Sequence, residues 1–277
     1  MQAYFETADG VLINYTIHRE GKRPVILLHG WGGNQLSFNT TVNELKGDFT
    51  VITYDHRGFG KSGHPDKGYS VERLAADLKE LLEHLALQDV LLVGWSMGGV
   101  VATTYLDQYG SDRVSGLVLV DLTARIISDE TFPYGFYEGT YTKADCLDDV
   151  AKMAKDFRLF AQEMPVKGDM RLYDEAARAV FVDRVVAQNP NPNPCIAMWL
   201  SIAEMDLVES YKRLDVPILF CHGGTSQYCS PAACEYVLSL LKDACLVEFP
   251  ECSHFIPIER PQKFAEAIDK FVVNKLG

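Results

Sequence analysis

The sequence lacks an apolar run long enough to cross a membrane. None of the hydrophobic stretches in its 277 residues approaches the roughly 18 residues that a spanning helix requires. The first residues, Met1 to Glu6, also lack the basic and apolar regions of a secretory signal peptide. We therefore expect a cytoplasmic protein that has no membrane partner.

The chain is also short of positive charge. It has 26 Lys and Arg against 38 Asp and Glu, which gives a formal net charge of -12. An acidic surface repels phosphate backbones and anionic lipids, so a nucleic-acid partner is not expected. The 47% of hydrophobic and 23% of charged residues are typical of a globular protein and exclude a disordered or fibrous chain.

Cysteines paired at metal-ligand spacing are missing as well. The chain has 7 cysteines, an odd number, and their spacing is irregular. A zinc site requires closer pairs or histidine partners on a helix, so we expect no metal and no cofactor. Without an export signal, reduced thiols are the expected state.

Predicted strands and helices alternate along most of the chain. Short apolar runs that end at turn residues are typical of buried parallel strands, and apolar residues at helical spacing indicate the helices. This alternation predicts an α/β fold with a mainly parallel sheet, whose ligands bind at the carboxyl ends of the strands. The expected strands lie in 4–17 (a hairpin of two), 24–28, 49–54, 90–93, 116–120, 216–220 and 246–249, and the expected helices cover 71–85, the residues after 96, 232–241 and 262–276.

The alternation breaks between residues 123 and 213. This stretch has helical patterning and is rich in aromatic and methionine side chains. No helix is expected to run through its Asn-Pro repeat from Asn189 to Pro194, because the residue before a proline favours extended backbone. We predict a helical cap at 123–213, inserted into a core domain formed by 1–122 and 214–277, with a minority of its aromatic side chains facing a pocket.

A G-x-S-x-G motif, Gly94-Trp95-Ser96-Met97-Gly98, lies between a predicted strand and a predicted helix. In this setting the serine stands on a sharp, strained turn that raises its hydroxyl above the sheet, and the glycines avoid a steric clash across the turn. The N-terminus of the following helix adds N–H groups and a positive dipole. Ser96 is therefore the candidate nucleophile.

The glycine-rich loop from His29 to Gly33 follows an earlier predicted strand. Backbone N–H groups in such a loop can stabilise the negatively charged oxygen that forms during acyl transfer. We expect the N–H groups of Trp31 and of Met97, the residue after the nucleophile, to form this oxyanion hole.

A serine hydroxyl is a poor nucleophile until a base accepts its proton. His254 follows the last predicted strand and fits a chain order in which the nucleophile comes first and the base last. We predict that His254 is this base.

Taken together, these motifs resemble the α/β-hydrolase superfamily, and within it the group of small esterases, perhydrolases and C–C hydrolases. The resemblance implies an α/β-hydrolase fold with a mostly parallel eight-stranded sheet, flanking helices and an inserted helical cap. It covers nearly the whole chain outside 123–213, and it implies no catalytic role for the loop from Asp55 to Ser62. The matching segments are His29–Gly32, Asp55–Ser62, Gly94–Gly99 and Ser253–Phe255.

The chain departs from this family at the third catalytic residue. The family usually has an acid in an H-G-x-x-D motif after the strand expected at 216–220, and this chain has Ser226 there. No Asp or Glu occurs between Asp215 and Glu235 to replace it. A hydroxyl can orient an imidazole ring but cannot balance the charge of an imidazolium as a carboxylate does.

Some members of the superfamily carry the acid one strand earlier, which here points to Asp121 after the strand at 116–120. We predict that Asp121 orients His254. Two alternatives stay open at this point. Asp121 could cap the first turn of the inserted segment, and a cap acid such as Glu204 or Asp206 could reach the histidine instead.

These residues predict a serine hydrolase that cleaves a small, largely apolar carboxylic ester, thioester or amide through an acyl-enzyme. The aromatic cap favours an apolar small-molecule substrate. A cofactor-free dioxygenase or C–C hydrolase on the same fold is the first alternative, with the His–Asp pair acting as a base on the substrate. A ligand-binding pseudo-hydrolase of low activity is the second, with Ser226 as the mark of a decayed triad.

Overall fold

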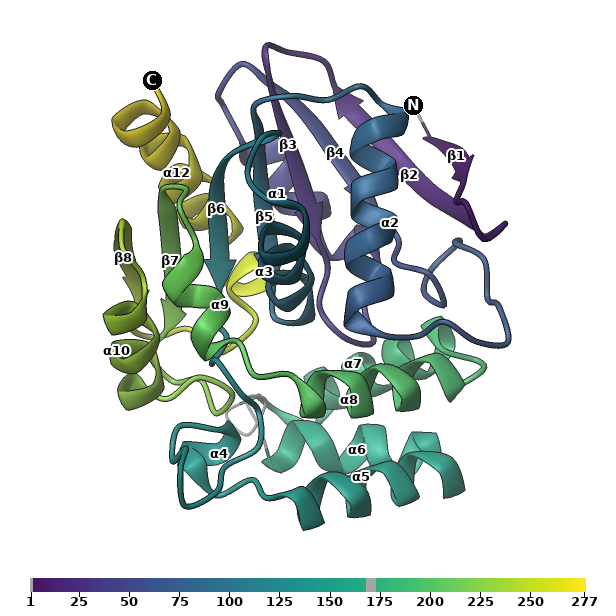
Figure 1. Ribbon diagram of the computed structural model, residues 1–277. Helices are drawn as coiled ribbons and strands as arrows, with labels where there is room; N and C mark the ends of the chain where they lie inside the picture. Colours follow the sequence, from purple (N-terminus) through teal and green to yellow (C-terminus); the bar gives the residue numbers. More distant parts are fainter. Residues whose placement is uncertain (1, 168–172) are drawn as a thin grey trace.

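A single eight-stranded sheet forms the centre of the computed structural model, which describes residues 2–167 and 173–277 (Figure 1). The strands lie in the order β1-β2-β4-β3-β5-β6-β7-β8. Strand β2 is antiparallel to β1 and β4, and the other neighbours are parallel. The predicted mostly parallel sheet is thus confirmed. The strands are β1 (Gln2–Glu6), β2 (Leu12–Arg19), β3 (Arg23–Leu28), β4 (Phe49–Tyr54), β5 (Val90–Trp95), β6 (Val114–Val120), β7 (Ile218–Gly223) and β8 (Ala244–Phe249).

Helices cover both faces of this sheet, which explains why its central strands are apolar throughout. Side chains alternate between the faces of a strand, and the core divides accordingly. Ile26 of β3 packs in the cluster of α2 and α3, whereas Val25 and Leu27 pack in the cluster of α1 and α12. The core helices are α1 (Asn39–Glu44), α2 (Val71–His84), α3 (Met97–Tyr109), α10 (Pro231–Leu240), α11 (Ile256–Glu259) and α12 (Pro261–Phe271).

Helix α2 shows how local sequence sets these elements. Ser70 precedes the helix with extended backbone, and its side chain accepts the N–H of Arg73, so it satisfies one of the free donors of the first turn. Apolar side chains at helical spacing then form one buried face against the sheet. The buried apolar residues of the helix are Val71, Leu74, Ala75, Leu78, Leu81 and Leu82.

Within the described residues, six helices connect β6 to β7. Figure 1 shows α5 to α8 as a separate layer below the ends of the parallel strands. Helix α9 instead packs on the core, since Ser210 and Arg213 both bond to Asp107 of α3. The division of the chain into cap and core stays a prediction. The helices are α4 (Phe136–Gly139), α5 (Lys143–Lys155), α6 (Phe157–Lys167), α7 (Glu175–Gln188), α8 (Asn193–Glu204) and α9 (Val208–Arg213).

One expectation for this segment is wrong in part. Helix α8 begins inside the Asn-Pro repeat, at Asn193, and Pro194 occupies its first turn. Proline is tolerated there because the first N–H groups of a helix have no intrahelical acceptor to lose. The extended connector is therefore shorter than the sequence suggested.

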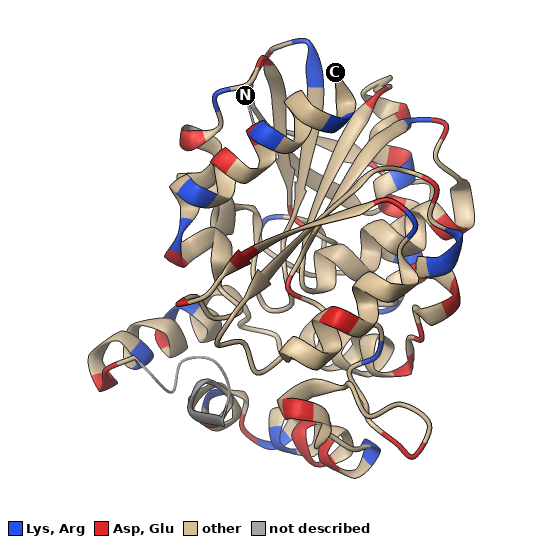
Figure 2. Cartoon of the chain, turned by 90° about the vertical axis from the view of Figure 1, so that its left-hand side faces the viewer, with Lys and Arg blue, Asp and Glu red and all other residues tan. Residues whose placement is uncertain are grey.

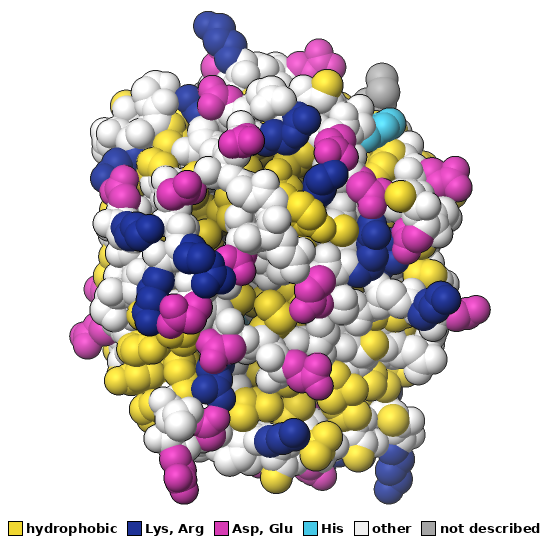
Figure 3. All heavy atoms as spheres, in the orientation of Figure 1, with side chains coloured by type: hydrophobic (Ala, Val, Ile, Leu, Met, Phe, Trp, Pro, Cys, Tyr) yellow, Lys and Arg dark blue, Asp and Glu magenta, His cyan; other side chains and the backbone are white. Residues whose placement is uncertain are grey.

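Most charged side chains lie on the outer surface in a mixed pattern. Figure 2 shows Lys and Arg interspersed with Asp and Glu over the helices, while the sheet interior carries few of either. The face drawn in Figure 3 likewise alternates between acidic, basic and small apolar areas. Among the residues that the structure describes, none of the helices has the length and hydrophobicity needed to span a membrane.

Candidate active site

Ser96 stands on a strained turn between β5 and α3. Its backbone angles are φ 53° and ψ -121°, in a region that a residue with a side chain rarely adopts. The packing around the turn leaves no space for larger neighbours. A Cβ atom at Gly98 would lie 2.1 Å from the carbonyl oxygen of Leu28, and one at Gly94 would lie 2.5 Å from Cα of Gly99. The two glycines are therefore required by the turn itself.

His254 and Asp121 form a buried pair beside this turn. Nδ1 of His254 lies 2.7 Å from Oδ2 of Asp121. Asp121 is 0% exposed and His254 is 7% exposed, so water barely reaches the pair. A carboxylate can only accept, so Nδ1 donates, and Nε2 is left as the basic nitrogen. The indole N–H of Trp95, next to Ser96, donates to the His254 carbonyl at 2.8 Å and ties the histidine to the same turn.

Ser226, at the position where the family usually carries its acid, bonds to Asp121. Its hydroxyl donates to Oδ2 at 2.6 Å, and the N–H of Gly223 donates to Oδ1 at 2.9 Å. The Ser226 oxygen in turn accepts the N–H groups of Tyr228 at 3.1 Å and Cys229 at 3.2 Å. These two N–H groups orient the hydroxyl proton toward Asp121. Ser226 is therefore a partner of the carboxylate and not a substitute for it.

The cap acids considered from the sequence lie elsewhere. Glu204 and Asp206 are exposed, and neither lines the cavity at Ser96. Asp206 instead accepts the N–H of Val208 at 3.0 Å, near the start of α9. The geometry therefore favours Asp121 as the acid beside His254.

The glycine-rich loop lies against the nucleophile turn, as its expected role requires. Gly30, Trp31 and Met97 line the same cavity as Ser96, and a Cβ atom at Gly30 would lie 3.4 Å from Cβ of Ser96. Met97 is the first residue of α3, and N–H groups in the first turn of a helix have no intrahelical acceptor. Its N–H is thus suited to bind an external oxygen.

A buried histidine holds this loop in place. Nε2 of His29 accepts the N–H of His56 at 3.1 Å, so Nδ1 carries the proton and donates to the carbonyl of Gly30 at 2.8 Å. Burial lowers the pKa of His29, which keeps the ring neutral. The neutral ring fixes the backbone just before Trp31.

The cavity between the sheet and the cap has a volume of about 460 Å³. Ser96, His254 and Asp121 line one part of it, and the remaining walls are mostly apolar. The indole of Trp31 bridges the core and the cap, because it donates to the Cys195 carbonyl at 2.8 Å. The apolar and aromatic lining residues include Val100, Leu122, Ile126, Phe136, Met164, Phe181, Trp199, Ile202, Tyr228 and Phe255.

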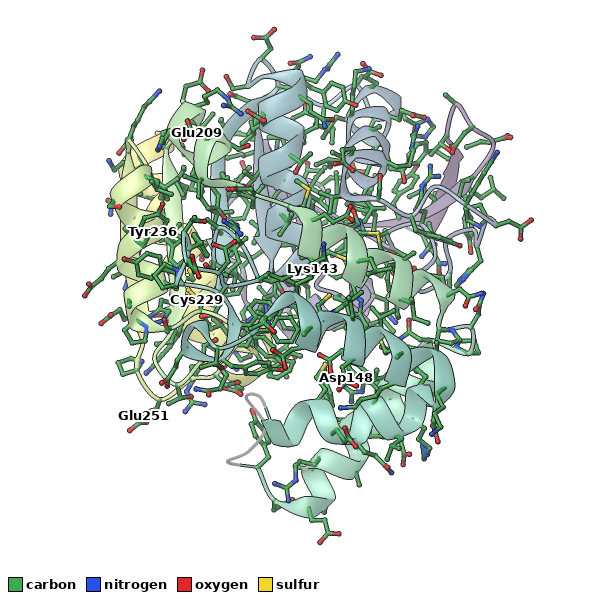
Figure 4. The ribbon with its side chains drawn as sticks, turned by 60° about the horizontal axis from the view of Figure 1, so that its bottom comes forward. Lys143, Asp148, Glu209, Cys229, Tyr236 and Glu251 are labelled. Atoms are coloured by element: carbon green, nitrogen blue, oxygen red, sulfur yellow. The ribbon has the colours of Figure 1, made fainter. Side chains whose placement is uncertain are left out.

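One group of side chains near the site has the chemistry of metal ligands. Ligand atoms of Asp121, His222 and Cys229 lie within 4.8 Å of one another. Figure 4, a view from the cap end, labels Cys229 beside the ribbon of α10. Both oxygens of Asp121 already accept hydrogen bonds, from Gly223 on Oδ1 and from Ser226 on Oδ2. Protein donors thus occupy both carboxylate oxygens, and we assign no metal to this group.

Sequence reasoning missed Glu259, which supports the histidine loop. Its carboxylate accepts the N–H of Ser253 at 2.8 Å, the Ser253 hydroxyl at 2.5 Å and the Cys252 thiol at 2.9 Å. Tyr173, from the cap segment, also donates to it. No local motif marks this acid. Its contacts form only because α11 folds back onto the loop that carries Cys252 and Ser253.

The comparisons with known proteins identify the family of this fold. The model of the alpha/beta hydrolase fold family matches residues 23–261. A Synechocystis sp. protein, whose name marks it as a candidate non-heme chloroperoxidase, is 34% identical over 206 residues, which is 73% of both chains. The pimeloyl-[acyl-carrier protein] methyl ester esterase of Vibrio cholerae is 30% identical over 206 residues, covering 72% of this chain and 74% of its own.

The similarity extends to a solved structure. An esterase from Exiguobacterium antarcticum superposes with a TM-score of 0.88 at 25% identity, over 99% of this chain and 100% of that one. Sequence similarity and fold similarity thus agree on one assignment. The chain belongs to the α/β-hydrolase family, and it is an enzyme of the group that includes esterases and other hydrolases.

Proposed function

We propose that the protein is a serine hydrolase that cleaves a small, largely apolar carboxylic ester, thioester or amide. Ser96 attacks the carbonyl carbon while its proton passes to Nε2 of His254. The bond to the leaving group breaks as His254 gives that proton to the leaving atom, and an acyl-enzyme remains. Water then attacks the same carbon and gives one proton to His254. The acid departs as this proton returns to Ser96.

The observation that carries the proposal is the buried bond between His254 Nδ1 and Asp121 Oδ2, at 2.7 Å. It supports a basic Nε2 on the cavity side and a carboxylate that stabilises the imidazolium during each proton transfer. The N–H groups of Trp31 and Met97 serve as the oxyanion hole, which typically contributes a factor of about 10²–10³ per donor to the rate.

The walls of the cavity support an apolar substrate of modest size. A volume of about 460 Å³ falls in the usual range for small-molecule sites. The aromatic side chains Phe136, Trp199 and Tyr228 surround it from the cap and from the loop after β7. They suit an acyl or aryl group held beside Ser96 and the oxyanion hole.

Labelling with a fluorophosphonate, measured by intact mass, tests the proposal. We expect one stoichiometric adduct on the wild-type protein, no adduct on Ser96→Ala, and strongly slowed labelling of His254→Ala and Asp121→Asn. Absence of labelling on the wild type would contradict a serine hydrolase and would favour a dioxygenase or a ligand-binding protein. Labelling unaffected by Asp121→Asn would keep the hydrolase and reject Asp121 as its acid.

The haloperoxidase name of the Synechocystis relative favours one second candidate, perhydrolysis. In this reaction hydrogen peroxide replaces water in attacking the acyl-enzyme, and the product is a peroxy acid that can oxidise halide. The same Ser96 variant separates the two: peroxide-dependent bromination of a phenol dye in acetate buffer should require Ser96. Bromination that survives Ser96→Ala would reject an acyl-enzyme route to it.

A further inference from the structure

We infer that Arg184 binds a carboxylate of the substrate, so that the preferred substrate is an ester with a free carboxylate away from the scissile bond. This inference rests on the proposed function, because it names the class of ester that the same cavity accepts. Arg184 belongs to α7, and its side chain lines the cavity that contains Ser96. It is exposed, which places it at the mouth of the cavity.

The position of Arg184 on its helix explains how it reaches the cavity. Phe181, Arg184, Val185 and Gln188 are three or four residues apart, so they share one face of α7. All four line the cavity. This face therefore gives the substrate two apolar and two polar groups, and the polar ones can bind the far end of a bifunctional substrate.

The charge of Arg184 is not neutralised by its described neighbours. Within the described residues, no hydrogen bond or ion pair engages its guanidinium. The adjacent acid, Asp183, pairs with Arg158 instead. The cavity holds one other formal charge among its described lining residues, Asp121, which is 0% exposed and is bonded to His254. Among the residues that the structure describes, nothing competes with a ligand for this positive charge.

The chemistry of the guanidinium selects the kind of group that it binds. Its planar N–H donors match a carboxylate in a bidentate arrangement, and no other Lys or Arg is among the described residues that line the cavity. The protein carries a formal net charge of -12, which repels anionic substrates in general. An arginine at the mouth offsets this repulsion locally, where it affects entry and binding.

Matched ester pairs that differ only in one charge test the inference. The first series consists of 4-nitrophenyl monoesters of dicarboxylic acids from succinate to sebacate, each compared with its ω-methyl ester. The second pair is 4-acetoxybenzoate and its methyl ester, which place the charge on the leaving group. The measurement is the ratio of kcat/KM for the charged and neutral members, in wild type, Arg184→Gln, Arg184→Lys and Arg178→Gln.

Arg178→Gln is the matched control, because it removes the same charge from the same helix at a residue that does not line the cavity. We expect a wild-type ratio above one in at least one series, with an optimum chain length. Arg184→Gln should lower that ratio about fivefold, the effect of a partly exposed ion pair, through a loss that is larger for the charged ester than for the neutral one. Arg184→Lys should retain part of the preference for the charged ester. Added salt should weaken this preference in the wild type.

The outcomes distinguish a failure of the carboxylate site from a failure of the proposed serine hydrolase function. A ratio that is the same in Arg184→Gln and wild type, with the neutral esters still hydrolysed, would overturn the carboxylate site alone. An equal loss in Arg178→Gln would also overturn it, since the effect would then be one of overall charge. Failure of Ser96-dependent hydrolysis of every ester would instead contradict the proposed function.

Discussion

Ser226 and His254 both donate to the same oxygen of Asp121. The hydroxyl of Ser226 lies 2.6 Å from Oδ2, and Nδ1 of His254 lies 2.7 Å from it. Ser226 lies in the loop after β7, where the family usually carries its catalytic acid. This loop therefore contacts Asp121, which follows β6. The loop after β7 and the histidine loop thus meet at one carboxylate.

This convergence predicts that the acid can be moved between the two positions. Asp121→Asn alone should lower kcat by about 10³–10⁴, because an amide neither balances the imidazolium nor fixes its tautomer. Adding Ser226→Asp should recover at least tenfold of this loss, since a carboxylate then returns to the same neighbourhood. Steady-state hydrolysis of a neutral 4-nitrophenyl ester measures both effects.

The control for this pair is Asp121→Asn with Ser226→Asn, which has the shape of the rescued variant without its charge. It should show no recovery. Full activity of Asp121→Asn would contradict the role of Asp121, and equal recovery by the control would show that charge is not the cause.

Gly98→Ala should disrupt the nucleophile turn. Its Cβ would lie 2.1 Å from the Leu28 carbonyl oxygen, a contact that only movement of the backbone can relieve. We expect loss of activity and a decrease of more than about 2 kcal/mol in the free energy of unfolding. Gly110→Ala is the comparison, because its Cβ meets nothing within 4 Å and only its φ of 76° is unfavourable. Unchanged activity and an unchanged urea midpoint in Gly98→Ala would contradict steric crowding at Gly98.

Glu259→Gln should loosen the loop that carries His254. The substitution turns a carboxylate that accepts from Ser253 and Cys252 into an amide with half the acceptor capacity. We expect a stability loss of about 1–3 kcal/mol and a lower kcat with little change in KM. Glu266→Gln, on the exposed face of α12, should have neither effect. Equal kcat in both variants would show that Glu259 has no positioning role.

The buried histidines predict a stability that falls on mild acidification. Burial lowers the pKa of His29 and holds that of His56 well below its ordinary value, so the folded protein keeps both rings neutral. The unfolded chain binds protons on these rings as the pH falls below about 6.5, and the free energy of unfolding then decreases. Above that pH both states are neutral and this effect disappears.

Urea denaturation at pH 7.5 and pH 5.5 measures the change. Among the described groups, neither ring nitrogen of His56 has a hydrogen-bond partner, so His56→Phe keeps an aromatic ring, breaks no side-chain hydrogen bond and removes one titrating group. The variant should lose less stability between the two pH values than the wild type. An identical loss in both proteins would assign the effect to other groups.

Much of this fold was predictable because the signals are local. Turn residues bound the apolar runs that became β3, β4 and β5, and helical spacing marked α2. The strained turn at Ser96 was also predictable, because a serine with glycines two residues away on either side, between a strand and a helix, is typical of such a turn. The start of α8 at Asn193 was not predictable from the sequence, because the first turn of a helix tolerates proline whereas the interior of a helix does not.

The sequence by itself determined the α/β class, the nucleophile turn and the late histidine, since each depends on neighbours within a few residues. Only the tertiary structure showed that Asp121, and not Glu204 or Asp206, contacts His254, because that contact depends on β6 lying between β5 and β7. The support from Glu259 and the place of Arg184 at the cavity mouth likewise arise from chain segments far apart in sequence. Their contacts follow from packing, which local patterns do not encode.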